Sequence, residues 1–400
     1  MLKNLFALVL LAGSALLLWW LYLAPASAPA PAVSTPPVSR DQAWYPQRDW
    51  ENAPSAALNL SAFAFRDRNR NGVMDGGDLP MAGVAFLLER PAGDLRAQRS
   101  NINGYANFSV RLRGDDEDIT QAGEPYHFEV MPPPGWQVTT GNSRQAATFS
   151  ALQGSPAGMV TDTPPAVVGL APDLTISGVV PAGASGWQLQ GPVGDPVALA
   201  SGAFRVAVQA GHWQLLDGQG RLVREVQVSE APVRLAALST SPLPAPLPQQ
   251  VQLDFEEPLR RAVIDKLPRG YRGLGFDYLL AVDNQHYQGP GYVNLLMGGR
   301  GVGYNSSGYP VTVTHAQPGE VFDFEGGWFA VAWPAAEGEE LALEGWRQGQ
   351  RLYHDSLPLS HLGPVWVQAD FRRIDELRLS TRHYWQFVTD DLQFRRTRPP

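Results

Sequence analysis

The sequence predicts an all-β chain made of several β-sandwich units behind an N-terminal transmembrane helix. Glycine (40) and proline (35) are abundant among its 400 residues, and such a composition favours short strands joined by turns. Short runs in which apolar and polar residues alternate recur along most of the chain, which is typical of strands with one buried face. Within the C-terminal unit that begins at residue 251, only the segment LRRAVIDKL at 259–267 looks helical.

The composition excludes several classes of protein. Hydrophobic residues make up 44% and charged residues 18% of the chain, which is ordinary for a folded protein. The net charge of −8 and the lack of a Lys/Arg-rich block argue against nucleic acid as a partner. The chain has no cysteine, so disulfides, thiolate metal sites and a cysteine nucleophile are excluded.

The N-terminus predicts a signal-anchor at residues 1–24. Its segment 5–24, LFALVLLAGSALLLWWLYLA, is uncharged and apolar, and as a helix it would cross the ~30 Å core of a bilayer. Lys3 before it favours a cytoplasmic start. We therefore expect a single-pass protein of a bacterial inner membrane, with its other domains in the periplasm or outside the cell. The alternative is a secreted protein, cut after the small residues that end at Ala28.

Composition divides the rest of the chain into three units and two spacers. Proline-rich stretches at 25–56 and 237–250 are expected to be extended spacers. Alternating strand patterns predict a β-sandwich at 57–171 and a small β domain at 172–236. Residues 251–400 contain strand patterns whose number and spacing suit a two-sheet jelly roll.

The stretch RDRNRNGVMDGGD at 66–78 predicts a calcium loop. Oxygen-bearing side chains occupy positions 1, 3, 5, 9 and 12 of a twelve-residue run, and the backbone carbonyl of Val73 adds a sixth ligand; calcium binds six to eight such oxygens. Gly72 at position 6 permits the sharp turn of such a loop. The ligands expected from side chains are Asp67, Asn69, Asn71, Asp75 and Asp78.

Two features bear on how this loop works. Position 12 is Asp78 where the pattern has Glu, so the affinity is expected to be weak, on the order of 10⁻⁴ to 10⁻³ M. The interleaved arginines, Arg66, Arg68 and Arg70, fall where side chains point away from the ion. The alternative is a plain hairpin, in which Asn71-Gly72 makes the turn and the charged residues pair on the surface.

The surroundings of the loop resemble the SdrD B-like domains of bacterial surface adhesins. The order F-x-F-x-D-x-N-x-N-G-x-x-D-x-x-D-x-P-x-x-G-V-x-F-x-L is followed by SNINGYANFSV and PPPGWQVTTGN, and the resemblance covers 61–142. It implies a calcium-stabilised β-sandwich stalk module in which the metal is structural. The matching residues are Phe63, Asp67, Asn69, Asn71, Asp75, Asp78, Gly83, Val84, Gly104, Tyr105 and Phe108.

The C-terminal unit resembles another family. VFDFEGGWFAVAW, LEGWRQGQRLYHDSLPLS and VQADFRRIDELRLS are similar to segments of the lectin-like jelly-roll domain of PEP-CTERM-associated bacterial exported proteins. Sandwiches of this architecture include carbohydrate-binding domains, so the resemblance implies sugar binding by analogy of fold.

A ligand site is expected in two loops of this unit, at 283–292 and 298–309. Both mix aromatic rings, which stack on sugars, with side chains that hydrogen-bond to hydroxyl groups. The candidates are Asp283, Asn284, His286, Tyr287, Arg300, Tyr304 and Asn305. The alternative is that they are turn residues. Three tryptophans in apolar strands, Trp328, Trp333 and Trp366, are expected to lie in the core.

A second calcium site remains open at the first and last strands of this unit. Asp254 or Glu256 together with Asp391 could hold the ion there. The sequence contains no nucleophile elbow, zinc motif or phosphate loop, so we expect a protein that is not an enzyme.

The function that these observations predict is binding. We expect a membrane-anchored, calcium-stabilised protein that presents a carbohydrate-binding-like domain outside the cytoplasm for adhesion to a glycan or a cell-surface protein. The alternative is a structural scaffold of an envelope or secretion complex. A hydrolase that acts on glycans is the third class.

Overall fold

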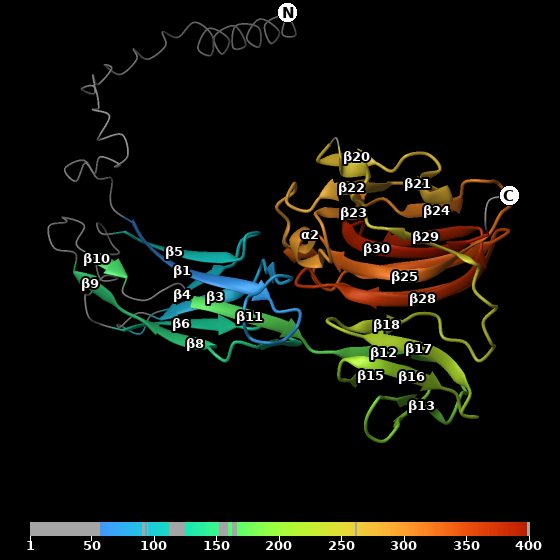
Figure 1. Cartoon of the computed structure of the whole chain (residues 1–400), viewed down its shortest axis with the longest axis horizontal. Coiled ribbons are helices and arrows are strands. Elements are labelled where there is room, and N and C mark those ends of the chain that lie inside the picture. The colour runs from blue at the N-terminus through green and yellow to red at the C-terminus, as the bar shows by residue number, and fades with distance from the viewer. Residues whose placement is uncertain are drawn as a thin grey trace, which may run out of the picture. The chain divides into compact units, whose positions relative to one another are not determined.

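A computed structural model describes residues 57–89, 93, 95–111, 125–151, 159–161, 166–260 and 262–397 of the chain. Strands dominate these residues, which confirms the all-β prediction (Figure 1). The strands follow one another along the chain in three groups.

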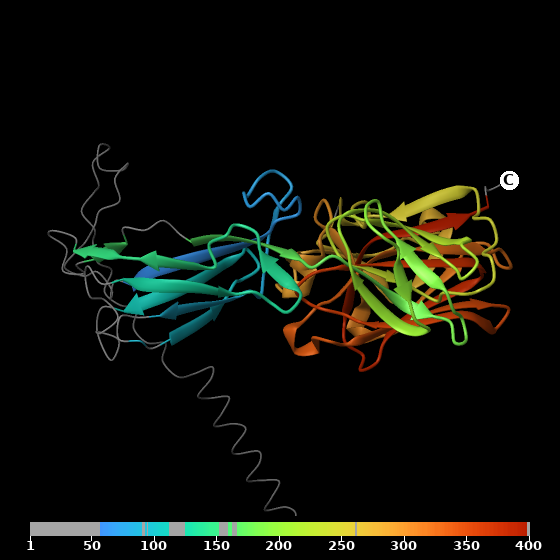
Figure 2. The same ribbon diagram turned by 90° about the horizontal axis from the view of Figure 1, so that it is seen from below.

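The first group of strands forms two facing sheets. One contains β2, β1, β11 and β7 in that order, with β5 also paired to β1, and the other contains β4, β3, β6 and β8; Figure 2 shows them as two layers. The strands are β1 (Ala57–Arg66), β2 (Leu79–Pro80), β3 (Ala85–Glu89), β4 (Leu95–Arg99), β5 (Tyr105–Arg111), β6 (Tyr126–Met131), β7 (Trp136–Val138), β8 (Arg144–Ala147), β9 (Phe149–Ala151), β10 (Met159–Thr161) and β11 (Ala166–Pro172). Alternation buries Phe86 and Leu88 of β3 against Phe108 and Phe128, as expected for a sandwich.

The second group of strands is smaller. β14, β13, β16 and β17 form a four-stranded sheet that shares a core with β12 and β18. That core includes Trp187, Leu189 and Leu215. The strands are β12 (Thr175–Val180), β13 (Trp187–Gln190), β14 (Val197–Leu199), β15 (Gly202–Ala207), β16 (Gly211–Leu216), β17 (Leu222–Val228) and β18 (Val233–Leu235).

The third group forms the predicted two-sheet arrangement. A sheet with β28, β25, β30, β23, β22 and β20 faces a five-stranded sheet with the order β21, β24, β29, β26 and β27. A core rich in phenylalanine, with Phe324 and Phe371 fully buried, fills the space between them. The elements are β19 (Gln249–Leu253), η2 (Pro258–Arg260), β20 (Ile264–Lys266), η3 (Tyr271–Gly273), β21 (Leu274–Asp277), β22 (Leu279–Asp283), α2 (Pro290–Leu295), β23 (Gly301–Asn305), η4 (Ser306–Gly308), β24 (Val311–His315), β25 (Phe322–Val331), η5 (Pro334–Ala336), β26 (Glu340–Arg347), β27 (Gln350–Pro358), β28 (Val365–Ile374), β29 (Glu376–Thr381) and β30 (Phe387–Arg396).

The second and third groups share one sheet. β18 pairs in parallel with β12 on one side and with β28 on the other, with Val233 opposite Trp366, so a ten-stranded sheet runs through both groups (Figure 1). The proline-rich stretch that follows β18 is also attached to this sheet. The Leu247 N–H donates to the buried carboxylate of Asp323 at 2.7 Å, and Arg373 donates to the carbonyl of Ala245 at 3.2 Å.

Two local predictions are wrong. The segment 259–267 forms part of η2 and the edge strand β20 and not a helix, because Ile264 pairs with Val282 across a β-ladder, and tertiary pairing outweighs helix propensity. The apolar run YVNLLM at 292–297 predicts a strand, but most of it lies in α2, which begins at Pro290. Proline is well suited to the first turn of a helix because it has no N–H to leave unpaired.

The prediction of a single-pass inner-membrane protein is corrected. Among the residues that the structure describes, no helix is long and apolar enough to cross a membrane. The signal-anchor expected at 1–24 and the spacer at 25–56 lie outside the described residues. The described residues give no support to membrane anchoring or to a membrane partner through that helix.

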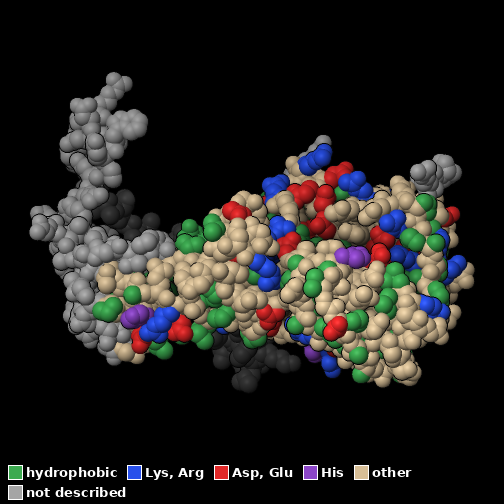
Figure 3. Space-filling view, turned by 60° about the horizontal axis from the view of Figure 1, so that its bottom comes forward, with side chains coloured by type: hydrophobic (Ala, Val, Ile, Leu, Met, Phe, Trp, Pro, Cys, Tyr) green, Lys and Arg blue, Asp and Glu red, His purple; other side chains and the backbone are tan. Residues whose placement is uncertain are grey.

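Charged side chains of both signs share the surface. On the face shown in Figure 3, acidic and basic side chains lie near one another and form no continuous field of one sign. Elsewhere, exposed pairs such as Arg144 with Glu129, at 3.4 Å, join neighbouring strands. Exposed pairs of this kind contribute little to stability, and they leave little unbalanced charge to define a charged binding surface.

Candidate functional site

The loop from Asp67 to Asp78 folds around its first residue. Asp67 is buried, and its two carboxylate oxygens accept hydrogen bonds from the backbone N–H groups of Asn71, at 3.2 Å, and Gly72, at 2.8 Å. Gly72 has a φ of +75°, and a Cβ there would lie 2.9 Å from the carbonyl oxygen of Thr139. Glycine is therefore required at position 6, as the sequence pattern predicted.

The other predicted ligands partly converge. The side-chain amides of Asn69 and Asn71 both donate to the same carboxylate oxygen of Asp75, at 3.0 and 2.7 Å. Asp78 instead accepts from the backbone N–H groups of Arg68, at 3.0 Å, and Asp75, at 3.1 Å. Rotating the two amides would turn their oxygens towards the point that their nitrogens now occupy. The donor set therefore fits calcium in chemistry, and three of its five side chains already meet.

The remaining groups of the loop contribute less. The side chain of Val73 is exposed, and its N–H donates to the amide oxygen of Asn71 at 2.8 Å. Within the described part of the chain, no three His, Cys, Asp or Glu side chains are grouped so that they could hold a metal ion. A calcium ion in this loop would depend on amide and backbone oxygens as well as on carboxylates.

The interleaved arginines reach other parts of the chain, although Arg68 also donates to the carbonyl oxygen of Gly77 within the loop at 3.3 Å. Arg66 is buried and donates to the carbonyl oxygens of Asn294, at 2.6 Å, and Leu296, at 2.7 Å, both at α2. Burial lowers the pKa of Arg66 to about 10. The carboxamide of Asn294 in turn bonds both the N–H and the C=O of Ala82, at 2.9 and 2.8 Å. The strand that enters the loop is thus attached to the C-terminal unit.

The next two arginines reach other elements. Arg68 makes two hydrogen bonds to the carboxylate of Glu230, one of them 2.7 Å long. Arg70 donates to the carbonyl oxygen of Pro172 at the end of β11. The loop therefore sits at a junction of all three groups of strands, and its conformation determines where three guanidinium groups lie.

The predicted ligand residues of 283–305 do not form one open site. Asp283 and Arg300 lie 3.5 Å apart as a partly exposed ion pair. His286 is exposed, and its ring contacts that of half-buried Tyr287 with centroids 4.8 Å apart. These four reach the surface, but they do not surround a cavity that the structure shows.

The other three predicted ligand residues are buried. Asn284 lies inside the turn, and the hydroxyl of Tyr304 is 3.1 Å from that of Tyr287. Burial raises the pKa of Tyr304. Asn305 is fully buried, and its oxygen accepts from the N–H of Phe387 at 2.7 Å. These side chains support the backbone and do not present themselves to a ligand.

A site that the sequence analysis missed lies where β17 faces β25, β28 and β30. It is a pocket of about 390 Å³, which we call the junction pocket. Two tryptophans and several amide and carboxylate side chains line it. They include Trp328, Trp366, Glu325, Gln368, Asp370 and Gln393.

The two tryptophans form the apolar wall of the junction pocket. Trp328 on β25 lies directly opposite Trp366 on β28, and their ring centroids are 5.1 Å apart in an edge-to-face arrangement. Both are partly exposed, in contrast to the fully buried Phe329 next to Trp328. Aromatic rings that keep a face accessible offer contact area with little loss of side-chain freedom.

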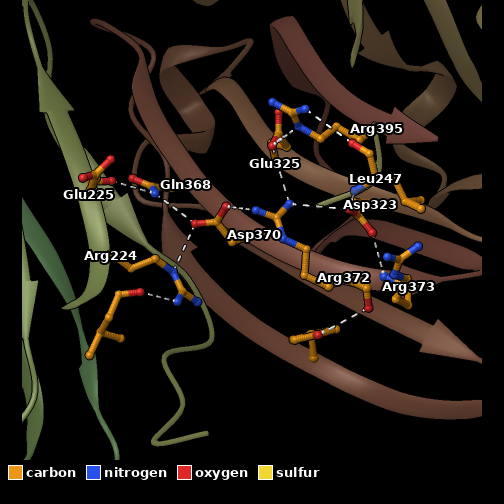
Figure 4. Close-up of polar contacts among 12 residues, drawn as sticks. Arg224, Glu225, Leu247, Asp323, Glu325, Gln368, Asp370, Arg372, Arg373 and Arg395 are labelled. Carbon is orange, nitrogen blue, oxygen red and sulfur yellow. Dashed lines mark hydrogen bonds and ion pairs between the residues drawn. The ribbon is translucent and has the colours of Figure 1, made fainter. Parts of the chain in front are cut away.

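The polar side of the pocket is held in place by ion pairs (Figure 4). One oxygen of Asp370 accepts from Arg372 at 2.8 Å; the other accepts from the amide of Gln368 at 2.9 Å and lies 3.1 Å from Arg224 of β17. Asp370 has a φ of +51°, an unusual backbone conformation for a residue with a side chain. Such conformations concentrate at functional sites, where surrounding contacts maintain them.

Charge is balanced across this network. Glu325 accepts from Arg395 at 2.6 Å and lies 3.5 Å from Arg372, which also pairs with Asp370 (Figure 4). The amide of Gln368 additionally donates to the backbone carbonyl of Glu225 at 3.0 Å, which links the two walls of the pocket. Polar groups held in this way are oriented before a ligand arrives, and pre-organisation reduces the cost of binding.

The expectation that the tryptophans are core residues explains why the pocket was missed. Trp333 is half-buried like the other two; it packs against a buried cluster, and its indole N–H donates to Gln386 at 2.8 Å. For Trp366 a signal was available in VWVQADF, where Val367, Ala369 and Phe371 are buried while Trp366 and Gln368 share the opposite, more exposed face. The sequence does not reveal that β17 packs there and forms the second wall.

Comparison with known proteins finds weak structural similarity. No protein-family model and no curated protein sequence matches the chain. The CBM22-1 xylan-binding domain of Xyn10C from Paenibacillus barcinonensis has a TM-score of 0.23 at 15% identity, over 39% of this chain and 100% of that domain. A mutant form of the shaft pilin SpaA of Lactobacillus rhamnosus GG has a TM-score of 0.21 at 9% identity, over 45% and 96% of the two chains.

A longer solved structure gives a similar result. The CBM22-1–CBM22-2 tandem of the same Xyn10C has a TM-score of 0.21 at 11% identity, over 86% of this chain and 79% of the tandem. Neighbours thus include carbohydrate-binding and pilin β-sandwiches, but such TM-scores carry no inference about what this chain binds. The SdrD B-like and PEP-CTERM-associated resemblances stay predictions.

Proposed function

We propose that this chain is a non-catalytic binding protein that recognises a glycan through the junction pocket. The observation that carries the proposal is the pairing of Trp328 and Trp366 in register beside the fixed polar groups of Glu325 and Gln368. A pyranose ring has apolar C–H faces that pack on aromatic rings and hydroxyl groups that bond to amides and carboxylates. The junction pocket offers both within one concave surface, the usual form of a small-ligand site.

The carboxylates of the pocket favour binding over catalysis. A glycosidase needs one carboxyl group that holds a proton beside one that is ionised. Glu325 and Asp370 are both paired with Arg372, so their oxygens are already engaged by a guanidinium and are not grouped as a free pair of carboxyl groups. We therefore keep the expectation that the chain is not an enzyme.

The test is binding of the full chain to a panel of soluble polysaccharides, measured through the change in tryptophan fluorescence. Trp328→Ala and Trp366→Ala are expected to weaken binding at least about tenfold, as the truncation of an aromatic anchor does. Trp346→Ala is the matched control, because Trp346 lies in the opposite sheet on β26 and is also partly exposed. If the panel shows no binding, the alternative of a scaffold for an envelope or secretion complex becomes the better account.

We also propose that calcium, bound at the loop of Asp67 to Asp78, stabilises the chain without taking part in ligand recognition. Its support is the chemistry of the loop and the three interleaved arginines, which attach the loop to α2, Glu230 and Pro172. On this account calcium fixes the loop, and the loop fixes the contacts among the three groups of strands. Polysaccharide binding measured in calcium and then in EDTA separates the two roles.

A further inference from the structure

Four large aromatic side chains project from one corner of the C-terminal unit. Their exposed fractions are 53% for Tyr278, 52% for Tyr309, 69% for Tyr384 and 37% for Trp385. We call these four residues the aromatic corner. They come from three separate segments: the turn between β21 and β22, the end of η4, and the turn between β29 and β30.

Backbone contacts hold these segments together. The N–H of Ser306 donates to the carbonyl of Tyr278 at 2.8 Å. The buried amide of Asn305 donates to the carbonyl oxygens of Tyr309, at 3.2 Å, and Trp385, at 3.4 Å. Asn305, expected from the sequence to contact a ligand directly, is thus a positioning residue for the aromatic corner.

Gly308 allows the closest approach. It has a φ of +75°, and a Cβ at this position would lie 1.7 Å from the carbonyl oxygen of Tyr384. Only a residue without a side chain lets the backbone of η4 reach that of the β29–β30 turn. The result places Tyr309 near Tyr384, while the rings of Tyr278 and Tyr309 lie 4.9 Å apart with 34° between their planes.

The backbone of the aromatic corner is strained at two of its tyrosines. Tyr278 and Tyr384 have φ values of +62° and +60°, a region that bulky side chains rarely occupy. Burial does not compensate for this strain, because both rings are more than half exposed. Strained backbone that displays large side chains to solvent is typical of binding sites.

We propose that the aromatic corner is a second binding site, which contacts the flat faces of sugar rings in an extended or insoluble polysaccharide. The three tyrosines each expose more than half of their surface, and their rings carry hydroxyl groups, which suits an uncharged, hydroxyl-rich surface. The corner includes no exposed aliphatic side chain that could enter a bilayer, and Asp277 and Arg382 beside it give no excess of one charge. A saccharide surface therefore fits better than a membrane.

This site is separate from the junction pocket. Both touch β30, where Trp385 precedes the strand and Gln393 lines the pocket. Trp328 of the pocket pairs with Asp390, five residues after Trp385, which corresponds to about 16 Å of extended chain. The aromatic corner can thus be removed without altering the pocket, and failure of one proposal can be told from failure of the other.

The experiment measures retention of the full chain on insoluble cellulose and chitin particles, together with binding of soluble polysaccharide. The double variant Tyr278→Ala/Tyr309→Ala is expected to bind at least one of the particles about tenfold more weakly, while soluble binding is unchanged. Tyr278→Phe/Tyr309→Phe, which keeps the rings, should retain most of the particle binding. Tyr105→Ala is the matched control, since Tyr105 is similarly exposed in the first group of strands.

Three outcomes would overturn the proposal. The first is equal retention of the Ala double variant and the unaltered chain. The second is no retention of the unaltered chain on either particle. The third is binding of the unaltered chain to phosphatidylcholine vesicles that the Ala double variant loses, which would make the corner a membrane contact. The loss of soluble binding in the Trp328→Ala variant tests the junction pocket independently of all three.

Discussion

Arg68 and Glu230 join the oxygen-rich loop to the segment between β17 and β18 by two parallel hydrogen bonds. A planar guanidinium that meets a carboxylate in this way fixes orientation as well as distance. β18 pairs with β28, the strand that carries Trp366. The contact therefore connects the loop to one wall of the junction pocket. The loop is therefore positioned to influence more than its own sandwich.

Glu230→Gln is expected to lower the free energy of unfolding by about 1–2 kcal/mol, because a charged hydrogen bond between partly buried groups becomes a neutral one. The side chains are 27% and 17% exposed, so solvent screens the pair only in part. Urea denaturation of the full chain measures the change. Glu225→Gln is the control, since Glu225 lies on β17 and its carboxylate only approaches His212, at 4.0 Å. Equal stability of the two variants would show that the contact is dispensable.

Calcium is expected to raise the melting temperature of the full chain. A ligand present at ten times its dissociation constant stabilises the folded state by about 1.4 kcal/mol, or a few degrees. Asp75→Ala should remove this rise, because Asp75 is where the amides of Asn69 and Asn71 meet. Asp195→Ala, at an exposed position outside the loop, should keep it. A melting curve that EDTA leaves unchanged in the unaltered chain would rule out the calcium hypothesis.

Most of the fold could be predicted because its strands carry the period-two pattern in their own residues. β3, for example, alternates half-buried and buried residues along AFLLE. The pattern failed where partners far along the chain decided the structure. Ile264 follows a helical spacing but pairs with Val282, and Gly303 in β23, expected within a loop, packs against Phe255 and pairs with Ala281.

The candidate site was harder to predict than the fold for a related reason. The ligands of the loop are close together in sequence, so spacing alone placed Asp67, Asn71 and Asp75 together. The junction pocket has β17 on one side and β25, β28 and β30 on the other, and Gln368 meets Glu225, 143 residues earlier in the chain, only in three dimensions. A tryptophan in an apolar strand has the same sequence signature whether its outer face is covered or open.

Asp390 is expected to make the chain less stable as pH rises. Burial, and then the nearby charge of Asp391, raises the pKa of Asp390 to about 8, whereas the unfolded chain titrates near 4. Between these values the folded state holds a proton that the unfolded state has released. The contribution to the free energy of unfolding is therefore greatest below pH 4 and falls as the pH rises to about 8.

Asp390→Asn tests this dependence, because asparagine has the shape of the protonated acid. The variant should show a shallower decrease in the free energy of unfolding between pH 5 and pH 8. Its absolute stability is a separate quantity, because both oxygens of Asp390 accept backbone N–H groups, from Met297 at 3.1 Å and Asp391 at 2.8 Å, and an amide nitrogen cannot. Urea denaturation at several pH values gives the slope. The exposed Asp195→Asn should follow the unaltered chain. A variant with the unaltered slope would mean that Asp390 is already ionised when folded.

Trp366 and Phe371 lie on the same strand, β28, and are expected to respond differently to truncation. Phe371 is fully buried and stacks on Tyr353 with ring centroids 4.8 Å apart, so Phe371→Ala should cost about 3–5 kcal/mol. Trp366 is partly exposed beside Trp328, so less apolar area is lost from the interior, and Trp366→Ala should cost about 1–2 kcal/mol. Urea denaturation compares the two variants directly. If Trp366→Ala is as destabilising as Phe371→Ala, then Trp366 is a core residue and the junction pocket loses the aromatic wall on which its proposed function depends.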